Sequence, residues 1–157
     1  MTWLEWLAAT PPAMLLQRSG TAYLLVNAAH IASLGVLIGT IVALDLRLLG
    51  LGRQVPINTA GSYLSRLAAA GLVLAIFTGF WLFTTQPEVY LDNTAFLVKL
   101  GLVCAGVLNA LCLHVRPAWQ RIVRAGAPAP ASMRLQAATS MLLWFFVILA
   151  GRWIGFL

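Results

Sequence analysis

Ionisable side chains lie within several long apolar runs of this sequence, where burial in lipid makes them costly. His30 and Asp45 belong to the first run, Lys99 to the third and Arg152 to the last. Ionisable residues inside membrane segments are rare, and they commonly bind ligands, ions or each other. A histidine nitrogen can ligate haem iron, and lysine or arginine can hold acidic groups such as haem propionates. These residue types could therefore hold a cofactor that carries acidic groups.

His30 is the strongest candidate for a cofactor-binding residue. It lies roughly 14 Å along the first run at about 1.5 Å per residue. On a helical wheel it shares one face with Tyr23 and Asn27. We expect these three residues to be cofactor-binding, with His30 as an axial ligand or hydrogen-bond partner. The alternative is a neutral histidine that only completes a hydrogen bond between two helices.

Lys99 and Arg152 lie near the ends of their runs, roughly 6 Å in by the same rise. With His30 they are expected to form a basic, cofactor-binding cluster near the outer leaflet. Each could instead extend its charged end to the lipid headgroups.

Cys104 lies about as deep in the third run as His30 does in the first. A histidine and a cysteine can hold a soft metal such as Cu(I). His30 and Cys104 are therefore the candidate metal ligands of a copper-handling protein. A cysteine in an apolar helix more commonly serves as a small apolar filler.

The second histidine, His114, is expected to play a different part. It lies near the far end of the third run, roughly 15 Å deeper than the first histidine at about 1.5 Å per residue, so the two cannot ligate one iron. We expect His114 to be an interfacial residue beside Arg116. Asp45, at the far end of the first run, is expected to pair with Arg53 or Arg66.

Composition places the chain in a membrane. Of its 157 residues, 61% are hydrophobic and 9% are charged, and the mean hydropathy is +0.90. Average soluble domains contain about 25% charged residues, and disordered chains need low hydrophobicity, so both classes are excluded. The formal net charge of +6 is typical of basic loops that orient membrane helices, and we expect no nucleic-acid partner.

Four apolar runs are separated by polar or Pro/Gly-containing breaks, and each has about the 20 residues that cross roughly 30 Å of hydrocarbon. The segment before them contains Glu5 and the Pro11–Pro12 pair, and it matches an interfacial helix better than a signal peptide. We predict an all-α fold: a single integral membrane domain, a four-helix transmembrane bundle with a short N-terminal interfacial helix. The interfacial helix is expected at about 3–17 and the spans at about 21–46, 63–84, 95–115 and 134–156.

The arginines predict the orientation. Of the ten Lys and Arg residues, seven fall on one side of the predicted spans, and such residues concentrate in cytoplasmic loops. We therefore expect a multi-pass protein of the bacterial inner membrane with both termini periplasmic. The seven residues are Arg47, Arg53, Arg66, Arg116, Arg121, Arg124 and Arg134.

Small residues recur at helical spacing on two spans. Such stripes let membrane helices approach closely, so both are predicted to be packing faces, the first of them opposite His30. The first stripe is Ala28, Ala32, Gly35, Gly39 and Ala43, and the second is Gly71, Ala75 and Gly79.

The chain resembles an uncharacterised family of small bacterial four-helix membrane proteins. The resemblance rests on the run from His30 to Gly39 and on Asp45-Leu-Arg-Leu-Leu-Gly50, and it covers nearly the whole chain. Further matching elements are Thr78-Gly79, Leu82-Phe83, Phe96 to Lys99, Asn109 and Gly151-Arg152. This resemblance implies the four-helix membrane fold and no particular activity.

A more distant resemblance is to CopD-like copper-resistance membrane proteins and to HemJ-like, haem-associated protoporphyrinogen oxidases. HemJ-like proteins carry a first-helix histidine, a later Leu-Pro-Arg-Leu motif and a lysine on another helix. His30, Leu46-Arg47-Leu48 and Lys99 match this arrangement, although Asp45 replaces the proline environment of the motif. The resemblance implies haem or a metal near His30.

Three functions follow as hypotheses. The first is a small redox subunit that binds haem b or a quinone near the outer leaflet around His30. The second is a copper-handling membrane protein that uses His30 and Cys104. The third is a structural or assembly partner without chemistry. The expected partners are the lipid bilayer and either a redox partner or further copies of the chain.

Overall fold

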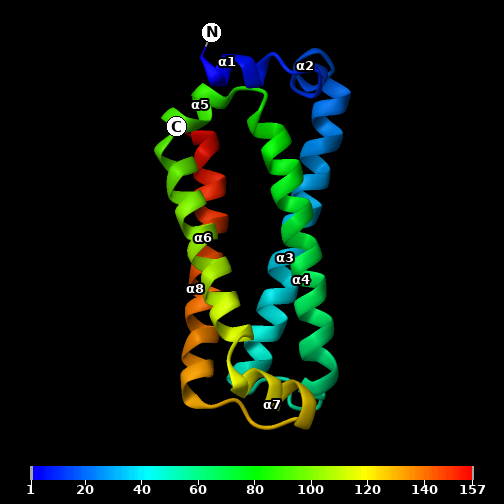
Figure 1. Cartoon of the computed structure of the whole chain (residues 1–157), viewed down its shortest axis with the longest axis vertical. Helices are drawn as coiled ribbons and strands as arrows, with labels where there is room; N and C mark the ends of the chain where they lie inside the picture. Colours follow the sequence, from blue (N-terminus) through cyan, green and yellow to red (C-terminus); the bar gives the residue numbers. More distant parts are fainter. Residues whose placement is uncertain (1, 157) are drawn as a thin grey trace.

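Four long helices run the length of the molecule, and short helices cover both of its ends in this computed structural model, which describes residues 2–156 (Figure 1). All four are long and apolar enough to cross a membrane. The shortest has 21 residues, which at about 1.5 Å per residue extends over about 32 Å, enough to cross the hydrocarbon layer. The predicted all-α, four-span fold is confirmed. The long helices are α3 (Gly20–Leu49), α4 (Ile57–Phe83), α6 (Thr94–His114) and α8 (Ala131–Trp153).

Local capping signals mark several of the helix ends. Each long helix begins before its predicted span, and α3 also ends beyond it, whereas α4, α6 and α8 end slightly short of the predicted ends. Ser19 accepts a hydrogen bond from the backbone of α3, and Gly50 ends that helix at a φ of 101°, in the left-handed region that favours glycine. Asn93 caps α6 in the same way as Ser19 caps α3. Pro56 precedes the first residue of α4, which starts well before residue 63 because helical hydrogen bonding continues through polar residues at the membrane edge.

The N-terminal segment is two helices where one was predicted at about 3–17. α1 (Trp3–Ala8) has a capping box, and α2 (Pro11–Arg18) begins with two prolines that lack the N–H groups needed to continue α1. Both helices lie across the end of the bundle, as an interfacial segment would (Figure 1). Trp81 of α4 holds α2 in place by donating a hydrogen bond to the Pro12 carbonyl over 2.8 Å.

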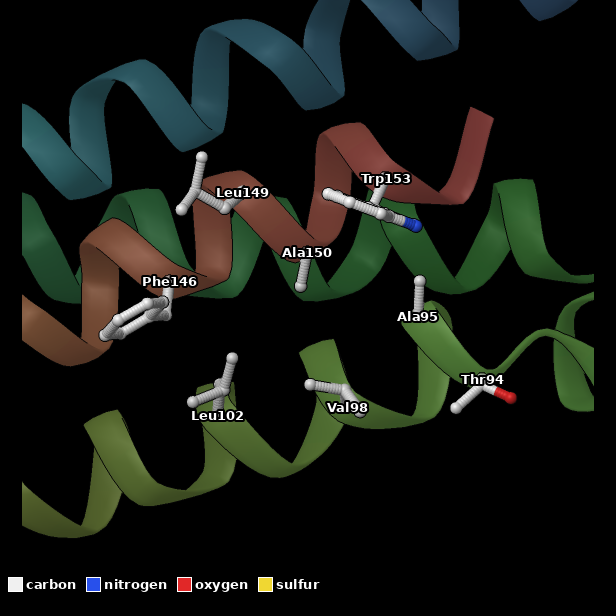
Figure 2. A pocket seen from close by; sticks show the side chains of 8 residues that line it. All are labelled: Thr94, Ala95, Val98, Leu102, Phe146, Leu149, Ala150 and Trp153. Atoms are coloured by element: carbon white, nitrogen blue, oxygen red, sulfur yellow. The ribbon is translucent and has the colours of Figure 1, made fainter. Parts of the chain in front are cut away.

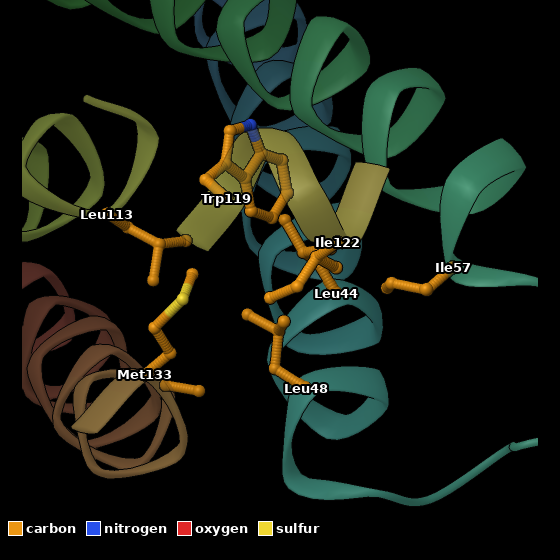
Figure 3. Packing of buried hydrophobic residues seen from close by; sticks show 8 residues of the cluster. Leu44, Leu48, Ile57, Leu113, Trp119, Ile122 and Met133 are labelled. Atoms are coloured by element: carbon orange, nitrogen blue, oxygen red, sulfur yellow. The ribbon is translucent and has the colours of Figure 1, made fainter. Parts of the chain in front are cut away.

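Two further helices, α5 (Pro87–Asp92) and α7 (Pro117–Ala125), lie in segments predicted as loops. α7 is amphipathic and buries Trp119 and Ile122 against Leu44 and Met133 of the long helices (Figure 3). This apolar cluster closes one end of the bundle. We call it the arginine-rich end, because the helix ends and connections there carry six of the predicted loop arginines: Arg47, Arg53, Arg116, Arg121, Arg124 and Arg134.

The opposite end carries α1, α2, α5 and both chain termini (Figure 1), and we call it the terminal end. A short 3-10 helix at Ile154–Phe156 follows α8 there. The first, second, third and fourth spans therefore alternate in direction, as predicted. Which end faces the cytoplasm stays a prediction.

The long helices pack as two pairs, α3 with α4 and α6 with α8, and α3 also contacts α8. The predicted packing stripe on α4 is confirmed: a methyl group built on Gly71 would lie 2.8 Å from the backbone nitrogen of Leu37. The predicted stripe on α3 is wrong, because all its members are exposed and methyl groups built on Gly35 and Gly39 would meet nothing within 4 Å. The glycines of α4 accept the larger side chains of α3, so α3 does not need its own small residues at this contact.

Candidate functional site

His30 of α3 packs directly on α4 in the half of the bundle towards the terminal end. Its Nδ1 lies 3.0 Å from the hydroxyl oxygen of Thr78. Its ring covers Gly79, where a methyl group would lie only 2.8 Å from Cε1. The absence of a side chain at Gly79 therefore creates the space that the imidazole ring occupies.

The hydrogen bonds of Thr78 determine which nitrogen of His30 donates. The Thr78 hydroxyl lies 2.7 Å from the Leu74 carbonyl oxygen and donates its proton there. A hydroxyl has one proton, so with that proton on the Leu74 carbonyl Thr78 accepts from His30, and we assign the ring hydrogen to Nδ1. The Ala75 backbone is a second hydrogen-bond partner of the ring. In the neutral ring Nε2 then keeps its lone pair, which makes it free to accept a proton or to ligate a metal.

Lys99 of α6 is the second basic group of this site. It is half-buried, and its side chain crosses α8 at Gly151, where a methyl group would lie 3.6 Å from Cε. It lies close enough to His30 for the two to interact electrostatically. Among residues 2–156 it forms no hydrogen bond or ion pair. An ammonium group in such surroundings favours a ligand that offers a carboxylate or carbonyl oxygen.

Aromatic residues cover the site at the terminal end. Phe83 of α4 stacks on Phe96 of α6 with ring centroids 5.7 Å apart, and Tyr90 of α5 contacts both rings. Tyr23 of α3 shares a hydrogen bond with Tyr90, whose pKa is raised by burial and by Tyr23. Asn27 is half-buried one turn from His30 and, in the described part of the chain, has no hydrogen-bond partner.

Two predicted members of the site lie elsewhere. Arg152 is exposed, and its guanidinium carbon lies 4.7 Å from the centre of the Phe156 ring, so it is directed along the C-terminal turn. Cys104 is exposed on α6, whereas His30 is enclosed against α4. Within residues 2–156, no group of three or more His, Cys, Asp or Glu side chains could hold a metal ion. The fold thus brings Lys99 towards His30 and leaves Cys104 on the surface.

His114 is the last residue of α6, which is compatible with its predicted interfacial position beside Arg116. Its ring nitrogens bond to the Ala110 carbonyl and the Ser65 hydroxyl, and its ring packs on Trp119. The prediction for Asp45 is wrong, because this residue is not paired with an arginine. It is only 4% exposed and accepts a hydrogen bond from Ser140, because α3 turns this residue towards α8 and away from the basic loops.

An apolar groove of about 590 Å³ lies between α6 and α8 near the terminal end (Figure 2). Val98 and Ala150 are among the residues that line it. Neither Lys99 nor Gly151 lines it, since consecutive residues of a helix point to different faces.

Sequence reasoning missed Thr78, Gly79 and Tyr90 as members of the site. Gly79 carried a usable signal, since it belongs to the small-residue stripe predicted to pack closely. Nothing in the sequence pairs Thr78 with a histidine 48 residues away.

Four apolar spans and two covered ends define the class, a small multi-pass membrane protein in contact with a lipid bilayer. The chain belongs to a family of unknown function, DUF6644, whose sequence model matches residues 4–157. No curated protein and no solved structure matches it. The resemblance to an uncharacterised family is confirmed at that level. The resemblance to CopD-like and HemJ-like proteins, and with it haem, quinone or copper binding, gains no support from these comparisons.

Proposed function

We propose that this protein is a small membrane redox subunit that binds the oxygen-bearing head of a quinone-like ligand between His30 and Lys99. One observation carries the proposal: a histidine held by Thr78 lies within electrostatic range of an unpaired, half-buried lysine, inside a membrane span. Two such groups without an acidic partner suit a ligand that offers both an acceptor oxygen and an exchangeable proton.

The two side chains have complementary parts in this proposal. The ammonium group of Lys99 donates to a carbonyl oxygen of the ligand, and Nε2 of His30 accepts the proton of a hydroxyl group. Thr78 and the bare backbone of Gly79 hold the imidazole ring in one position against α4. The quinone itself supplies electron and proton transfer when bound.

The apolar groove between α6 and α8 supports this choice of ligand. Membrane quinones carry long apolar tails, and the groove is large and apolar enough for part of such a chain.

Haem b is the alternative ligand for the same residues. His30 would supply an axial nitrogen and Lys99 would bind a propionate group. Absorption separates the two ligands, because purified protein with haem has a Soret band and protein with quinone has none.

The test is the ligand content of protein purified in mild detergent. We expect extractable quinone, lost in His30→Ala and reduced in Lys99→Met, and unchanged in Cys104→Ala as the exposed control. Purified protein that contains neither quinone nor haem would refute the redox proposal, and a structural or assembly role would remain. Bound copper that disappears in both His30→Ala and Cys104→Ala would favour the copper hypothesis.

We also propose that the arginine-rich end faces the cytoplasm of a bacterial inner membrane, with both termini periplasmic. The distribution of the arginines supports this orientation. A reporter fused at residue 125 should then be cytoplasmic and one fused at residue 90 periplasmic; the reverse pattern would refute it. In this orientation the His30–Lys99 site lies in the outer half of the membrane.

A further inference from the structure

A second polar cluster lies on α3 and α8, in the half of the bundle towards the arginine-rich end. Its centre is Asp45, which is 4% exposed. Ser140 of α8 donates a hydrogen bond to its carboxyl group. The remaining oxygen, Oδ2, is buried and has no partner among residues 2–156. Along α3 this cluster is roughly 22 Å from His30 at about 1.5 Å per residue, so the two sites are separate.

Two more unpartnered polar atoms lie on the same face of α8. Gln136 and Trp144 are one turn to either side of Ser140, and residues four apart share a helix face. Gln136 and Asn109 of α6 each donate to the other's backbone carbonyl over 3.2 Å, which leaves Gln136 Oε1 without a donor. Trp144 Nε1, packed against α6, also lacks a partner among the described residues. Native proteins leave few buried polar atoms unsatisfied, so this group indicates a missing ligand.

None of the basic groups around Asp45 pairs with it in the part of the chain that the structure describes. Arg47 and Arg134 donate to the carbonyl oxygens of Val55 and Leu49, each over 2.8 Å. Arg53 donates to the Gly50 carbonyl. On α6, His114 is held by Ala110 and Ser65, and on α4 the side chain of Arg66 is exposed. No ion pair with Asp45 occurs in the described chain.

A buried carboxylate without a cationic partner costs several kcal/mol, so buried charges are found paired or bound to cations. We propose that Asp45, with Ser140, forms a binding site inside the membrane for one small cation, either a proton or Na⁺. Oxygen atoms are the ligands that such hard cations require. Protonation of Oδ2 would turn this unpartnered acceptor into a hydrogen-bond donor. The proposal is independent of the function assigned to His30.

The first test is thermal unfolding of the purified full chain, with Asp45→Asn as the neutral, isosteric variant and Asp92→Asn, an exposed carboxylate, as the control. Wild-type protein is compared at pH 6 and pH 9, in choline chloride and in NaCl. We expect the lowest Tm at pH 9 without Na⁺, because both cations are then scarce. A tenfold change in occupancy shifts Tm by about 3–6 °C for a chain of this size.

The comparison of NaCl with choline chloride distinguishes Na⁺ binding from proton binding. A Tm restored at pH 9 by NaCl but not by choline chloride identifies Na⁺; a Tm restored only by lower pH identifies a proton. In both cases Asp45→Asn should lose the response and Asp92→Asn should keep it. Identical responses in wild type and Asp45→Asn would overturn the proposal.

A second measurement needs no variant and decides the case if Asp45→Asn does not fold. Dicyclohexylcarbodiimide, an apolar reagent, modifies protonated carboxyl groups in membranes. In Na⁺-free buffer we expect Asp45 to be modified at least several-fold faster than Asp92, as measured by peptide mass spectrometry. Suppression by Na⁺ would identify a sodium site. Modification of Asp45 no faster than of Asp92 would contradict the proposal.

Discussion

Replacing Gly79 by alanine tests whether the close contact of α4 with His30 creates the ligand site. The new methyl group would lie 2.8 Å from Cε1 of His30, whereas ordinary contacts begin at 3.4 Å. The imidazole ring must therefore move by about 0.6 Å, the difference between these distances. Such a shift strains the 3.0 Å hydrogen bond between His30 and Thr78.

The expected loss combines two costs. Forcing an extra methyl group into a packed contact costs about 1–3 kcal/mol, and a weakened hydrogen bond between membrane helices adds up to about 0.6–1.7 kcal/mol. Alanine also favours helices over glycine by up to about 1 kcal/mol. Gly35→Ala gives the matched control, because it brings the same helix preference at a position where a methyl group meets nothing within 4 Å.

The assay compares quinone or haem content and Tm for the two variants. We expect Gly79→Ala to be less stable than Gly35→Ala by about 1–5 kcal/mol and to lose most of its bound ligand, while Gly35→Ala keeps the ligand and is at least as stable as wild type. Equal stability and equal ligand content in the two variants would refute the contact as the origin of the site. A stability loss with normal ligand content would show that the His30 ring position does not control binding.

Three further changes test the same structure. Gly71→Ala should destabilise more than any exposed glycine variant, since its methyl group would meet the rigid backbone of Leu37 at 2.8 Å; an unchanged Tm would contradict the α3–α4 packing. Thr78→Val should lower ligand content and cost about 0.6–1.7 kcal/mol by removing the hydroxyl that bonds to His30, whereas Thr78→Ser should retain normal ligand content and stability, and loss of ligand in both variants would argue against the assigned hydrogen bond. Trp119→Ala should cost about 3–5 kcal/mol, because this 5% exposed side chain fills the core at the arginine-rich end; a Tm within error of wild type would show that α7 is not needed to close the bundle.

The sequence alone determined the spans and the class of protein. Their length and apolar content follow from the thickness of the bilayer, and no partner is needed to recognise them. Capping is also local: Ser19, Gly50 and Asn93 act within one turn of the helix ends they define. His30 and Lys99 could be singled out because charge in hydrocarbon is costly wherever the helix lies in the bundle.

Only the tertiary structure decided which helix faces meet. In lipid an apolar face is equally compatible with a neighbouring helix and with acyl chains, because lipid tails are as apolar as leucine. For this reason two similar small-residue stripes had different outcomes: the stripe of Gly71 and Gly79 packs, while that of Gly35 and Gly39 is exposed. The partners of polar groups depend on the same choice of faces. The hydrogen bond of His30 to Thr78 and that of Asp45 to Ser140 each join helices whose relative rotation no local sequence signal specifies.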